Sequence, residues 1–434
     1  MTPEAGSPAR RSRAREPGWR GRLSRLLARI GPGIITGVAD DDPSGIATYA
    51  QAGAQYGFNM LWTMPLAFPL MAAVQLMCAR IGRVTGKGLA ANIRESFPPA
   101  VLYVVVALLL VANTLNIAAD VAAMGETAQL VTGLDRHVMT AAFVVLTLGL
   151  QILIPYDRYV FFLKWLSLSL LAYAGVLLTV RVPWGEVALR SLLPRFAWNR
   201  DSAAVIVGVF GTTISPYLFF WQASEEVEDM QEEGGVPLRD APQTARATLR
   251  RVGWDTWSGM FYSDVTAYII MLATAVTLYP AGIHVIDTAA QAATALRPLA
   301  GHAAYLLFAL GIFGVGLIGV PVLAGSGAYA AAEAFGWTWG LERNLGQAPR
   351  FYAVIAASVL AGLVLQYTPI SPMRALFWSA VINGVVAVPL LVVVTLLATR
   401  RAVMGEFVAG RVIAALGWAA TVVMGAAAVA MLWP

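Results

Sequence analysis

The sequence has little cysteine, little histidine and little charge. One of its 434 residues is cysteine, three are histidine and 13% are charged. Cys78 alone can form neither an intramolecular disulfide nor a thiolate metal cluster. The histidines are His137, His284 and His302; all fall near the ends of apolar runs, which excludes a histidine-rich zinc or copper site within a membrane. No serine–histidine, His–Glu–His or paired-aspartate catalytic set lies within those runs, so we expect neither an enzyme nor a bound cofactor.

Long apolar runs take the place of charge. Hydrophobic residues make up 58% of the chain, whereas a soluble chain has about 45–50% apolar and about 25% charged residues. A helix that crosses a bilayer needs about 20 mostly apolar residues. The sequence therefore predicts an all-α integral membrane protein, with one transmembrane domain over residues 30–434. Eleven spans are predicted near 30–56, 59–83, 98–132, 137–154, 158–181, 202–232, 253–279, 302–335, 350–367, 373–399 and 409–432.

Arginine is concentrated before the first span. Eight arginines lie within residues 1–29, which we predict to be a basic cytoplasmic tail. Alternate connections after it are also basic, whereas those between them carry less charge, apart from the basic segment 182–200. We therefore expect a multi-pass protein of the plasma membrane, with its N-terminus inside and, for an odd number of spans, its C-terminus outside. A nucleic-acid partner, an obligate protein partner and a cleaved signal peptide are not expected.

The first span contains an unusual acidic stretch. Residues 37–45 read Gly-Val-Ala-Asp-Asp-Asp-Pro-Ser-Gly, which places Asp40, Asp41 and Asp42 among apolar residues. A carboxylate in hydrocarbon costs at least ~2.5–3.5 kcal/mol. Pro43 removes a backbone N–H and Gly45 adds flexibility, so the helix is expected to break here. The stretch predicts an unwound segment that lines a polar cavity and binds a cation.

A second span is interrupted in a similar way. Residues 211–216 read Gly-Thr-Thr-Ile-Ser-Pro, so a proline again stands beside hydroxyl residues in the middle of an apolar run. Broken helices at matching positions in two halves of a chain indicate a transporter built from inverted repeats, with its site between them. We place the repeats at about 30–181 and 202–399, with an extra helix at 409–432.

Further polar residues within the spans need partners. Asn116 and Asp120 are four residues apart and share one helix face, so Asp120 is expected to face a cavity or to be paired. Asp264 and Asn383 are candidates to line the same cavity. The acidic residues between 225 and 233 are interpreted as a solvated helix end facing the cytoplasm; the alternative is an acidic vestibule that concentrates cations.

Segments of the first two spans resemble one transporter family. Residues 42–45, the Ala-Thr pair at 47–48 and the Gly-Ala-Gln-Tyr-Gly segment at 53–57 resemble the first span of the NRAMP divalent-metal transporters, and residues 83–90 resemble the segment after that family's second span. The resemblance implies the leucine-transporter fold with an extra eleventh span.

The departures from the family pattern concern the metal ligands. Gly45 stands where the family has asparagine, and Ser215-Pro216-Tyr217 replaces Met-Pro-His. Ala123 replaces the glutamate that follows Asp120 in the family. A thioether selects softer metals, whereas a hydroxyl is a hard oxygen ligand. The pattern is similar to the NRAMP-related magnesium transporter branch, in which proton coupling is lost.

From these features we predict a divalent cation importer that works by alternating access on Mg²⁺, with Mn²⁺ also admitted and no proton coupling. One alternative is a proton-coupled Mn²⁺/Fe²⁺ transporter of the NRAMP type; another is a sodium-coupled symporter of an organic solute. For Asp42 the alternative to a metal ligand is a helix cap, and for Ser215 it is a hydroxyl bonded to the backbone. The predicted metal ligands are Asp42, Gly45, the Thr212 carbonyl and Ser215, with Asp41, Asp120, Tyr217 and Asn383 nearby or along the pathway.

Overall fold

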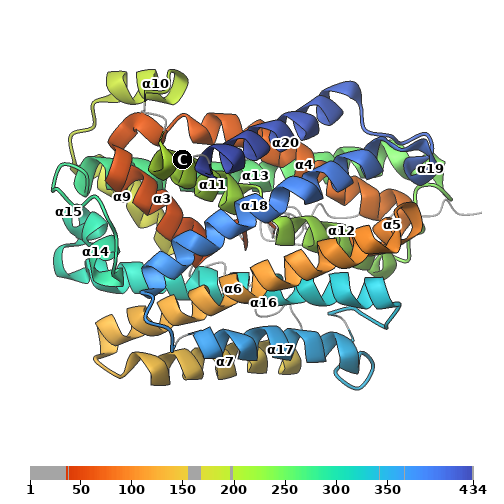
Figure 1. The fold of residues 1–434 in the computed structure, drawn as a ribbon, viewed down its shortest axis with the longest axis horizontal. Helices are drawn as coiled ribbons and strands as arrows, with labels where there is room; N and C mark the ends of the chain where they lie inside the picture. The colour runs from red at the N-terminus through yellow and green to blue at the C-terminus, as the bar shows by residue number, and fades with distance from the viewer. Residues whose placement is uncertain are drawn as a thin grey trace, which may run out of the picture.

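A computed structural model describes residues 36–37, 39–154, 168–195, 199–341, 343–365 and 367–432 of the chain. All regular secondary structure in these ranges is helical (Figure 1). The predicted basic tail, the start of the first span and the first ten residues of the fifth lie outside the described residues. The predicted repeat boundaries stay a prediction.

Eight helical segments among the described residues are long and apolar enough to cross a membrane. The eleven-span count is not confirmed as such, because the first and fifth predicted spans run into residues that are not described. The longer helices are α4 (Thr63–Thr85), α6 (Pro99–Thr132), α7 (Arg136–Leu153), α11 (Arg200–Thr213), α12 (Pro216–Glu232), α13 (Ala245–Thr277), α16 (Ala304–Phe335), α17 (Pro349–Leu365), α18 (Pro372–Thr399) and α20 (Arg411–Leu432). Shorter helices are α3 (Pro43–Tyr56), α5 (Leu89–Ser96), α9 (Leu171–Thr179), α10 (Trp184–Leu192), α14 (Ala289–Ala293), α15 (Arg297–Ala300) and α19 (Arg401–Met404), with 3-10 turns at Gly57–Met60, Leu168–Leu170, Pro242–Thr244, Thr294–Leu296 and Gly301–Ala303.

Both predicted helix breaks are confirmed. The helical turn that includes Ala39 and Asp40 ends at Asp41, and α3 starts at Pro43. The second interruption lies between α11 and α12, which starts at Pro216. Proline is favoured in the first turn of a helix, where its missing N–H has no intrahelical acceptor to lose. Each proline therefore starts a new helix instead of bending a continuous one.

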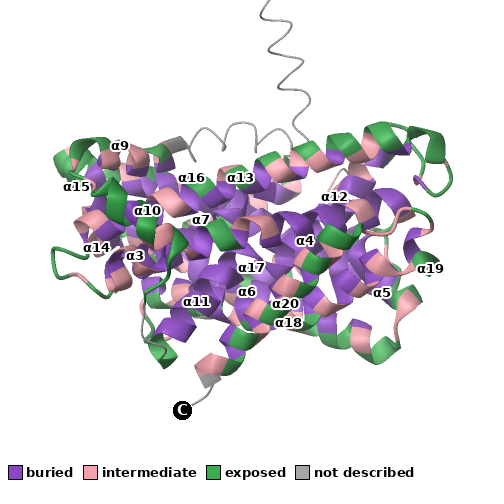
Figure 2. Ribbon diagram, turned by 90° about the horizontal axis from the view of Figure 1, so that it is seen from above, coloured by how far each residue is buried: buried purple, intermediate pink, exposed green. Residues whose placement is uncertain are grey.

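The helices pack in layers (Figure 1). Helices α7 and α17 lie side by side and cover α6 and α16. Helix α18 crosses beside α6 and reaches α11 and α20 on its other side. The short helix α3 packs between α13, α18 and α11, so the acidic break lies inside the bundle, where Figure 2 shows mostly buried residues.

Small residues permit a close crossing of α11 and α18. A Cβ atom added to Gly211 would lie 2.1 Å from the Ala380 carbonyl oxygen, and one added to Gly384 would lie 2.5 Å from that of Val207. Two helix backbones can approach this closely only where side chains are absent, as in other membrane bundles. The crossing at Gly211 therefore fixes the position of α11 next to Thr212, which is the following residue.

The connections gather at two ends of the bundle. At one end, which we call the α5 end, Arg80 donates to the Phe407 carbonyl at 3.2 Å and Arg400 donates to that of Ser96 at 2.9 Å. At the other, the α14 end, Arg374 pairs with Asp287. This grouping agrees with the predicted alternation of connections. Which end faces the cytoplasm stays a prediction, and so do the sides of the two termini.

The start of α13 and five short helices lie outside the predicted spans; these helices are α5, α10, α14, α15 and α19. Segment 182–200 was expected to be a loop, yet it contains α10, with Trp184 59% and Leu192 76% exposed. An amphipathic helix with exposed apolar residues suits the membrane interface. Helix α5 was not predicted either. Helix α13 starts at Ala245, eight residues before the predicted span, because its first turns are too basic to read as apolar.

Candidate metal site

The two helix breaks face each other inside the bundle. A Cβ atom on Gly45 would lie 3.0 Å from the Thr212 hydroxyl oxygen. Across the same contact, the Tyr217 hydroxyl donates to the Ala39 carbonyl at 3.1 Å. The predicted neighbours Gly45, Thr212 and Tyr217 are thus brought together by α3, α11 and α12, although no contact shows that they bind a metal.

Asp42 is the acidic side chain at the centre of this contact, and it is 1% exposed. Its Oδ1 accepts hydrogen bonds from the Ser44 hydroxyl at 2.7 Å and from the Gly45 N–H at 2.8 Å. Its Oδ2 accepts one from the Asn116 amide at 2.9 Å. Asp42 therefore caps α3, which was the alternative to a metal ligand. The two roles are compatible, because a carboxylate has about four lone-pair positions and these contacts use three.

Asn116 is the hub of a buried polar network. The other members, Asp42, Asp120 and Asn383, are predicted from the sequence to lie in or near the site, but Asn116 is not among those predicted site residues. Its amide also donates to Asp120 Oδ2 at 3.0 Å, and its carbonyl oxygen accepts from the Asn383 amide at 3.0 Å. The network joins α3, α6 and α18. Its signal in the sequence was the four-residue spacing from Asp120, which pointed to one helix face but not to Asp42.

The hydroxyl of Ser215 is bonded to the backbone, which was the alternative to its role as a metal ligand. Its hydroxyl lies 2.6 Å from the Thr212 carbonyl oxygen and 3.0 Å from that of Gly211, and it donates to these carbonyls, which the break leaves free. Such local bonds are usual for hydroxyl residues at helix interruptions. Oxygen lone pairs remain on both groups, so the metal-ligand role of Thr212 and Ser215 stays a prediction.

Asp41 lies apart from the Asn116 network. The Ser263 hydroxyl on α13 is 2.5 Å from Asp40 Oδ2 and 3.3 Å from Asp41 Oδ1. Within the described part of the chain, no three Asp, Glu, His or Cys side chains converge to hold one metal ion. A cation held by the described residues would therefore take at most two of these side chains, together with backbone or amide oxygens and water.

A wide cavity approaches the site from the α14 end. It has a volume of about 880 Å³ and is lined by Ala47, Gln51 and Gln55 of α3, with Asp201 and Arg374 opposite. Gln51 is fixed there, because its carbonyl oxygen accepts the Ile286 N–H at 2.9 Å. The cavity reaches α3 within one turn of Gly45, but the residues at the break are themselves buried.

An ion-pair network, which we call the Arg83 cluster, closes the α5 end. Arg83 of α4 is 2% exposed and pairs with Glu226 at 3.2 Å, Asp229 at 2.5 Å and Glu233 at 3.0 Å. Arg251 of α13 pairs with Glu233 at 2.7 Å. These acids hold α12 against α4 and α13. The interpretation as a solvated helix end was therefore wrong for Glu226, which is 1% exposed, and the pairing argues against a free acidic vestibule.

Glu233 follows the last residue of α12, and its charge is stabilised by its arginine partners. Burial alone would raise the pKa of Glu233. The hydrogen bond and charge of Arg251, together with the charge of Arg83, outweigh burial and hold the pKa below the ordinary glutamate value of 4.5. The Glu233 carboxylate is therefore ionised near neutral pH.

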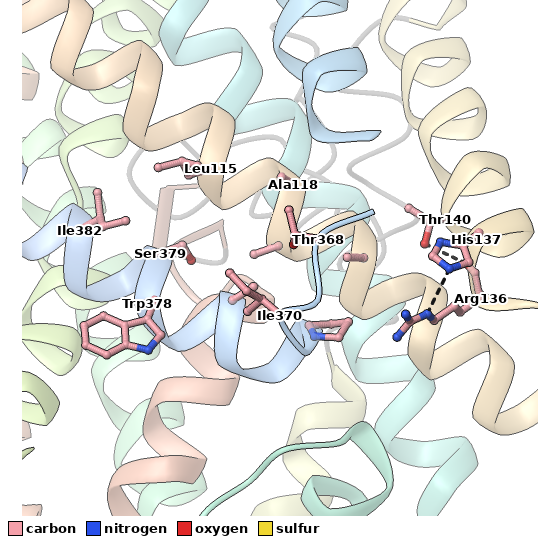
Figure 3. Close-up of a pocket in the computed structure, with 14 residues that line it drawn as sticks. Leu115, Ala118, Arg136, His137, Thr140, Thr368, Ile370, Trp378, Ser379 and Ile382 are labelled. Carbon is pink, nitrogen blue, oxygen red and sulfur yellow. Dashed lines mark hydrogen bonds between the residues drawn. The ribbon is translucent and has the colours of Figure 1, made fainter. Parts of the chain in front are cut away.

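A separate apolar pocket of about 760 Å³ lies between α6, α7 and α18 (Figure 3). Ala118, Trp378 and Ile382 line it, and Arg136 donates to His137 at its edge at 3.4 Å. No carboxylate is among its lining residues, so this pocket does not suit a cation.

An apolar helical bundle with two broken helices that meet around a buried carboxylate is the architecture of a membrane transporter built from inverted repeats. Residues 33–434 match the family model described as natural resistance-associated macrophage protein-like. The chain therefore belongs to the Nramp family.

Individual relatives and solved structures agree with this assignment. The chain is 28% identical to the divalent metal cation transporter MntH of Acidiphilium cryptum, over 93% of this chain and 89% of the relative. It is 29% identical to MntH of Aeromonas hydrophila, over 88% and 89%. A structure of the Eremococcus coleocola manganese transporter has a TM-score of 0.75 at 17% identity, covering 96% of this chain and 88% of that one. The nucleobase-cation-symport-1 family transporter MHP1 has a TM-score of 0.54 at 14% identity, covering 93% and 92%; these two structures support the fold.

Proposed function

We propose that this protein carries a divalent metal cation across the membrane by alternating access, with Asp42 as the charged ligand. The observation that carries the proposal is the buried Asp42 carboxylate at the meeting point of the two breaks. Its hydrogen-bond donors are Ser44, Gly45 and Asn116, which are all neutral. Neutral donors leave the carboxylate charge uncompensated, so a cation is favoured there.

The two ends of the bundle support alternating access. The cavity at the α14 end reaches α3. The cavity at the α5 end, of about 740 Å³ and lined by residues such as Asn92 and Arg400, includes no residue of the two breaks, and the Arg83 cluster holds α4, α12 and α13 together at this end. In this arrangement an ion approaches from the α14 end, and the cluster must separate before the ion can leave at the α5 end. If the predicted orientation holds, this direction is import.

Mn²⁺ is the ion that the comparisons favour, since the relatives are named divalent metal cation transporters and one structural neighbour is named a manganese transporter. Mg²⁺ is the second candidate. It is favoured by the oxygen-only donors at the two breaks, because Mg²⁺ prefers hard oxygen ligands and retains water. The Ser215 hydroxyl, bonded to backbone carbonyls, offers nothing that would select a soft metal.

Proton movement separates the two candidates further. Ala123 and Tyr217 stand where the family pattern carries an acid and a histidine, which favours transport without protons. A coupled Mn²⁺ transporter remains the alternative, and it is the one that the named relatives support. The sodium-coupled symport of an organic anion is disfavoured, because Asp42 would repel the anion.

Uptake by proteoliposomes tests the proposal. We expect Mn²⁺ to enter vesicles that contain the protein, and Asp42→Asn to reduce uptake by at least about tenfold. Asp240→Asn, an exposed acid in the connection before α13, is the matched control and should transport like the wild type. Unchanged uptake in Asp42→Asn would remove Asp42 from the site.

The same vesicles identify the ion and its coupling. Competition by Mg²⁺ at comparable concentration favours the magnesium candidate. Internal acidification that follows metal entry, read with a trapped pH dye, favours the proton-coupled manganese candidate. Competition by an amino acid but not by metals would support the symporter and reject both.

A further inference from the structure

Two acidic side chains beside Asp42 are not used by the site described above. Asp40 is 0% exposed and Asp41 is 1% exposed. Both approach the Ser263 hydroxyl of α13, Asp40 through Oδ2 at 2.5 Å and Asp41 through Oδ1 at 3.3 Å. We call these three residues the Ser263 cluster. It lies on the α13 side of the break, whereas the Asn116 network lies on α6 and α18.

The packing of the first span on α13 fixes the position of this cluster. A Cβ atom on Gly37 would lie 2.2 Å from the Gly259 carbonyl oxygen, so the two backbones are in contact at this point. Ser263 is four residues after Gly259, which is one helical turn. Asp40 and Asp41 follow Gly37 by three and four residues. The glycine contact therefore sets the acids opposite Ser263 by register.

The cluster contains buried oxygens that no described group satisfies. Asp40 Oδ1 and Asp41 Oδ2 have no hydrogen-bond partner among the residues described in the structure. The single Ser263 proton serves two carboxylates, which leaves most of their lone pairs free. The charged side chains that act on the pair are Asp42 and Asp264, and both are acidic. Asp264, next to Ser263, is 8% exposed and its Oδ1 is also without a partner in the described chain.

Buried carboxylates require either a proton or a cation for compensation, because an unpaired charge within a membrane is strongly unfavourable. Two carboxylates, a hydroxyl and retained water form the kind of oxygen ligand set that Mg²⁺ and other hard divalent cations accept. A set of only two carboxylates is also consistent with the absence of three converging acidic, His or Cys side chains in the described ranges.

We propose that Asp40, Asp41 and the Ser263 hydroxyl form a second site for a hard, partly hydrated divalent cation, next to Asp42 on the side of the α5 end. The direction follows from Thr36, four residues before Asp40, which donates to Gln222 at 2.6 Å. Gln222 in turn donates to Glu226 of the Arg83 cluster at 3.2 Å. An ion that leaves Asp42 toward the α5 end thus passes the second site first. The inference rests on the proposed function for the identity of the ion.

Titration calorimetry with Mn²⁺ on the full chain in detergent tests the second site. We expect about two ions per chain for the wild type and about one for the Asp40→Asn/Asp41→Asn double variant, whose amides keep the shape but lose the charge. Asp42→Asn should also bind about one ion, through the Ser263 cluster. Asp240→Asn removes one exposed carboxylate, as a control that is charge-matched to Asp42→Asn, and should retain the wild-type stoichiometry.

Paramagnetic resonance of bound Mn²⁺ gives an independent readout. Two neighbouring Mn²⁺ ions broaden each other's spectrum, so the wild type should show broadening that both Asp42→Asn and the double variant lose. Ser263→Ala, which removes one neutral ligand and no charge, should weaken the second ion by about tenfold and keep the first.

The outcomes separate this inference from the proposed function. The second site is overturned if the double variant still binds two ions. It is also overturned if the wild type binds only one ion and only Asp42→Asn abolishes that binding. In both cases the transport proposal stands, and Asp40 and Asp41 hold protons instead of a metal ion. A wild type that binds no divalent ion overturns both. If the double variant is not monodisperse, Ser263→Ala takes its place. An unchanged affinity for the second ion in Ser263→Ala then rejects the second site.

Discussion

At the breaks, the amide of Asn116 contacts Asp42, whereas the hydroxyl of Ser215, a predicted metal ligand, bonds backbone carbonyls of its own helix break. Asn116 donates to both Asp42 and Asp120, and it also accepts from Asn383. One uncharged side chain therefore orients two carboxylates from different helices. The orientation of a metal ligand by its hydrogen-bond partner typically contributes 10–100-fold to metal affinity.

Asn116→Ala should accordingly raise the KM for the transported ion by about tenfold or more, because Asp42 loses its link to α6. Uptake by proteoliposomes over a range of metal concentrations measures this effect. Asn113→Ala is the matched control: Asn113 lies one turn earlier on α6, is also buried, and donates to Leu323 and Ser326 of α16 instead of to Asp42. Equal KM changes in both variants would indicate general damage to α6.

Ser215→Ala should affect transport less than Asp42→Asn does. The Ser215 hydroxyl is used by the Thr212 and Gly211 carbonyls, so its loss should cost about 0.5–1.5 kcal/mol of stability. Thermal unfolding and KM are measured on the same preparation. A KM increase as large as that of Asp42→Asn, without loss of stability, would instead restore Ser215 as a metal ligand.

At the scale of single residues, the sequence could predict that acidic side chains are buried at the first break, since three acids lie in an apolar run beside a proline. The role of Asp42 as a metal ligand stays a prediction. The sequence could not predict which way each acid turns. Ser263 is 223 residues from Asp40, and Arg83 is 143 from Glu226, so these pairs arise only from helix packing. The buried position of Glu226 was missed for the same reason: a run of acids on one helix is typical of a solvated face.

At the scale of elements, the breaks were predictable because proline acts locally on the backbone, wherever the helix packs. The helix starts at Pro43 and Pro216 follow from that chemistry alone. Helix α10 was not predictable in this way. Its nine residues are fewer than a span needs, and its exposed apolar residues suit a membrane interface. A search for apolar runs long enough to cross a membrane does not detect such a helix.

The crossing of α11 and α18 gives a test of packing at this scale. Gly211→Ala adds a methyl group where the nearest backbone atom is 2.1 Å away, so the helices must separate. We expect a loss of about 1–3 kcal/mol, seen as a lower Tm in detergent. Gly253→Ala is the control, since a Cβ there meets nothing within 4 Å and helix propensity favours alanine; its Tm should be unchanged or higher. A Tm for Gly211→Ala equal to that control would contradict the close crossing.

At the scale of the whole molecule, the position of the polar groups defines one closed end. The Arg83 cluster joins α4, α12 and α13 through ion pairs, while the cavity that reaches α3 lies at the α14 end. In the proposed transport cycle, the cluster must open without unfolding the bundle. Its strength should therefore control how often the α5 end opens.

Acid should weaken this closure. The pKa of Glu233 is held below 4.5 in the closed state, so its contribution is present above that value and is lost as the pH falls through the lowered pKa. We expect the Tm of the wild type to fall more steeply below about pH 4.5 than that of Glu233→Gln, which has no charge to lose. Asp229 remains beside Arg83 and Arg251 in both proteins. Parallel Tm curves for the two proteins would exclude a role for Glu233 in closure.

Substitution of Arg83, the positively charged side chain at the centre of the Arg83 cluster, gives the strongest test that this cluster keeps the α5 end closed. Arg83→Gln leaves the buried Glu226 without its partner, and breaking a buried pair in this way costs about 3–5 kcal/mol. The closed state then loses population to states in which the α5 end is open.

A cysteine reporter measures this opening. Cys78→Ala first removes the single native thiol, and Thr36→Cys introduces a reporter at a buried position on the path between Asp40 and the cluster. The reporter should react with a water-soluble maleimide at least about tenfold faster in the Arg83→Gln background. Lys87→Gln, which breaks an exposed pair with Glu95 at the same end, should leave the rate unchanged. If both substitutions raise the rate equally, or neither does, the Arg83 cluster is not what keeps this end closed.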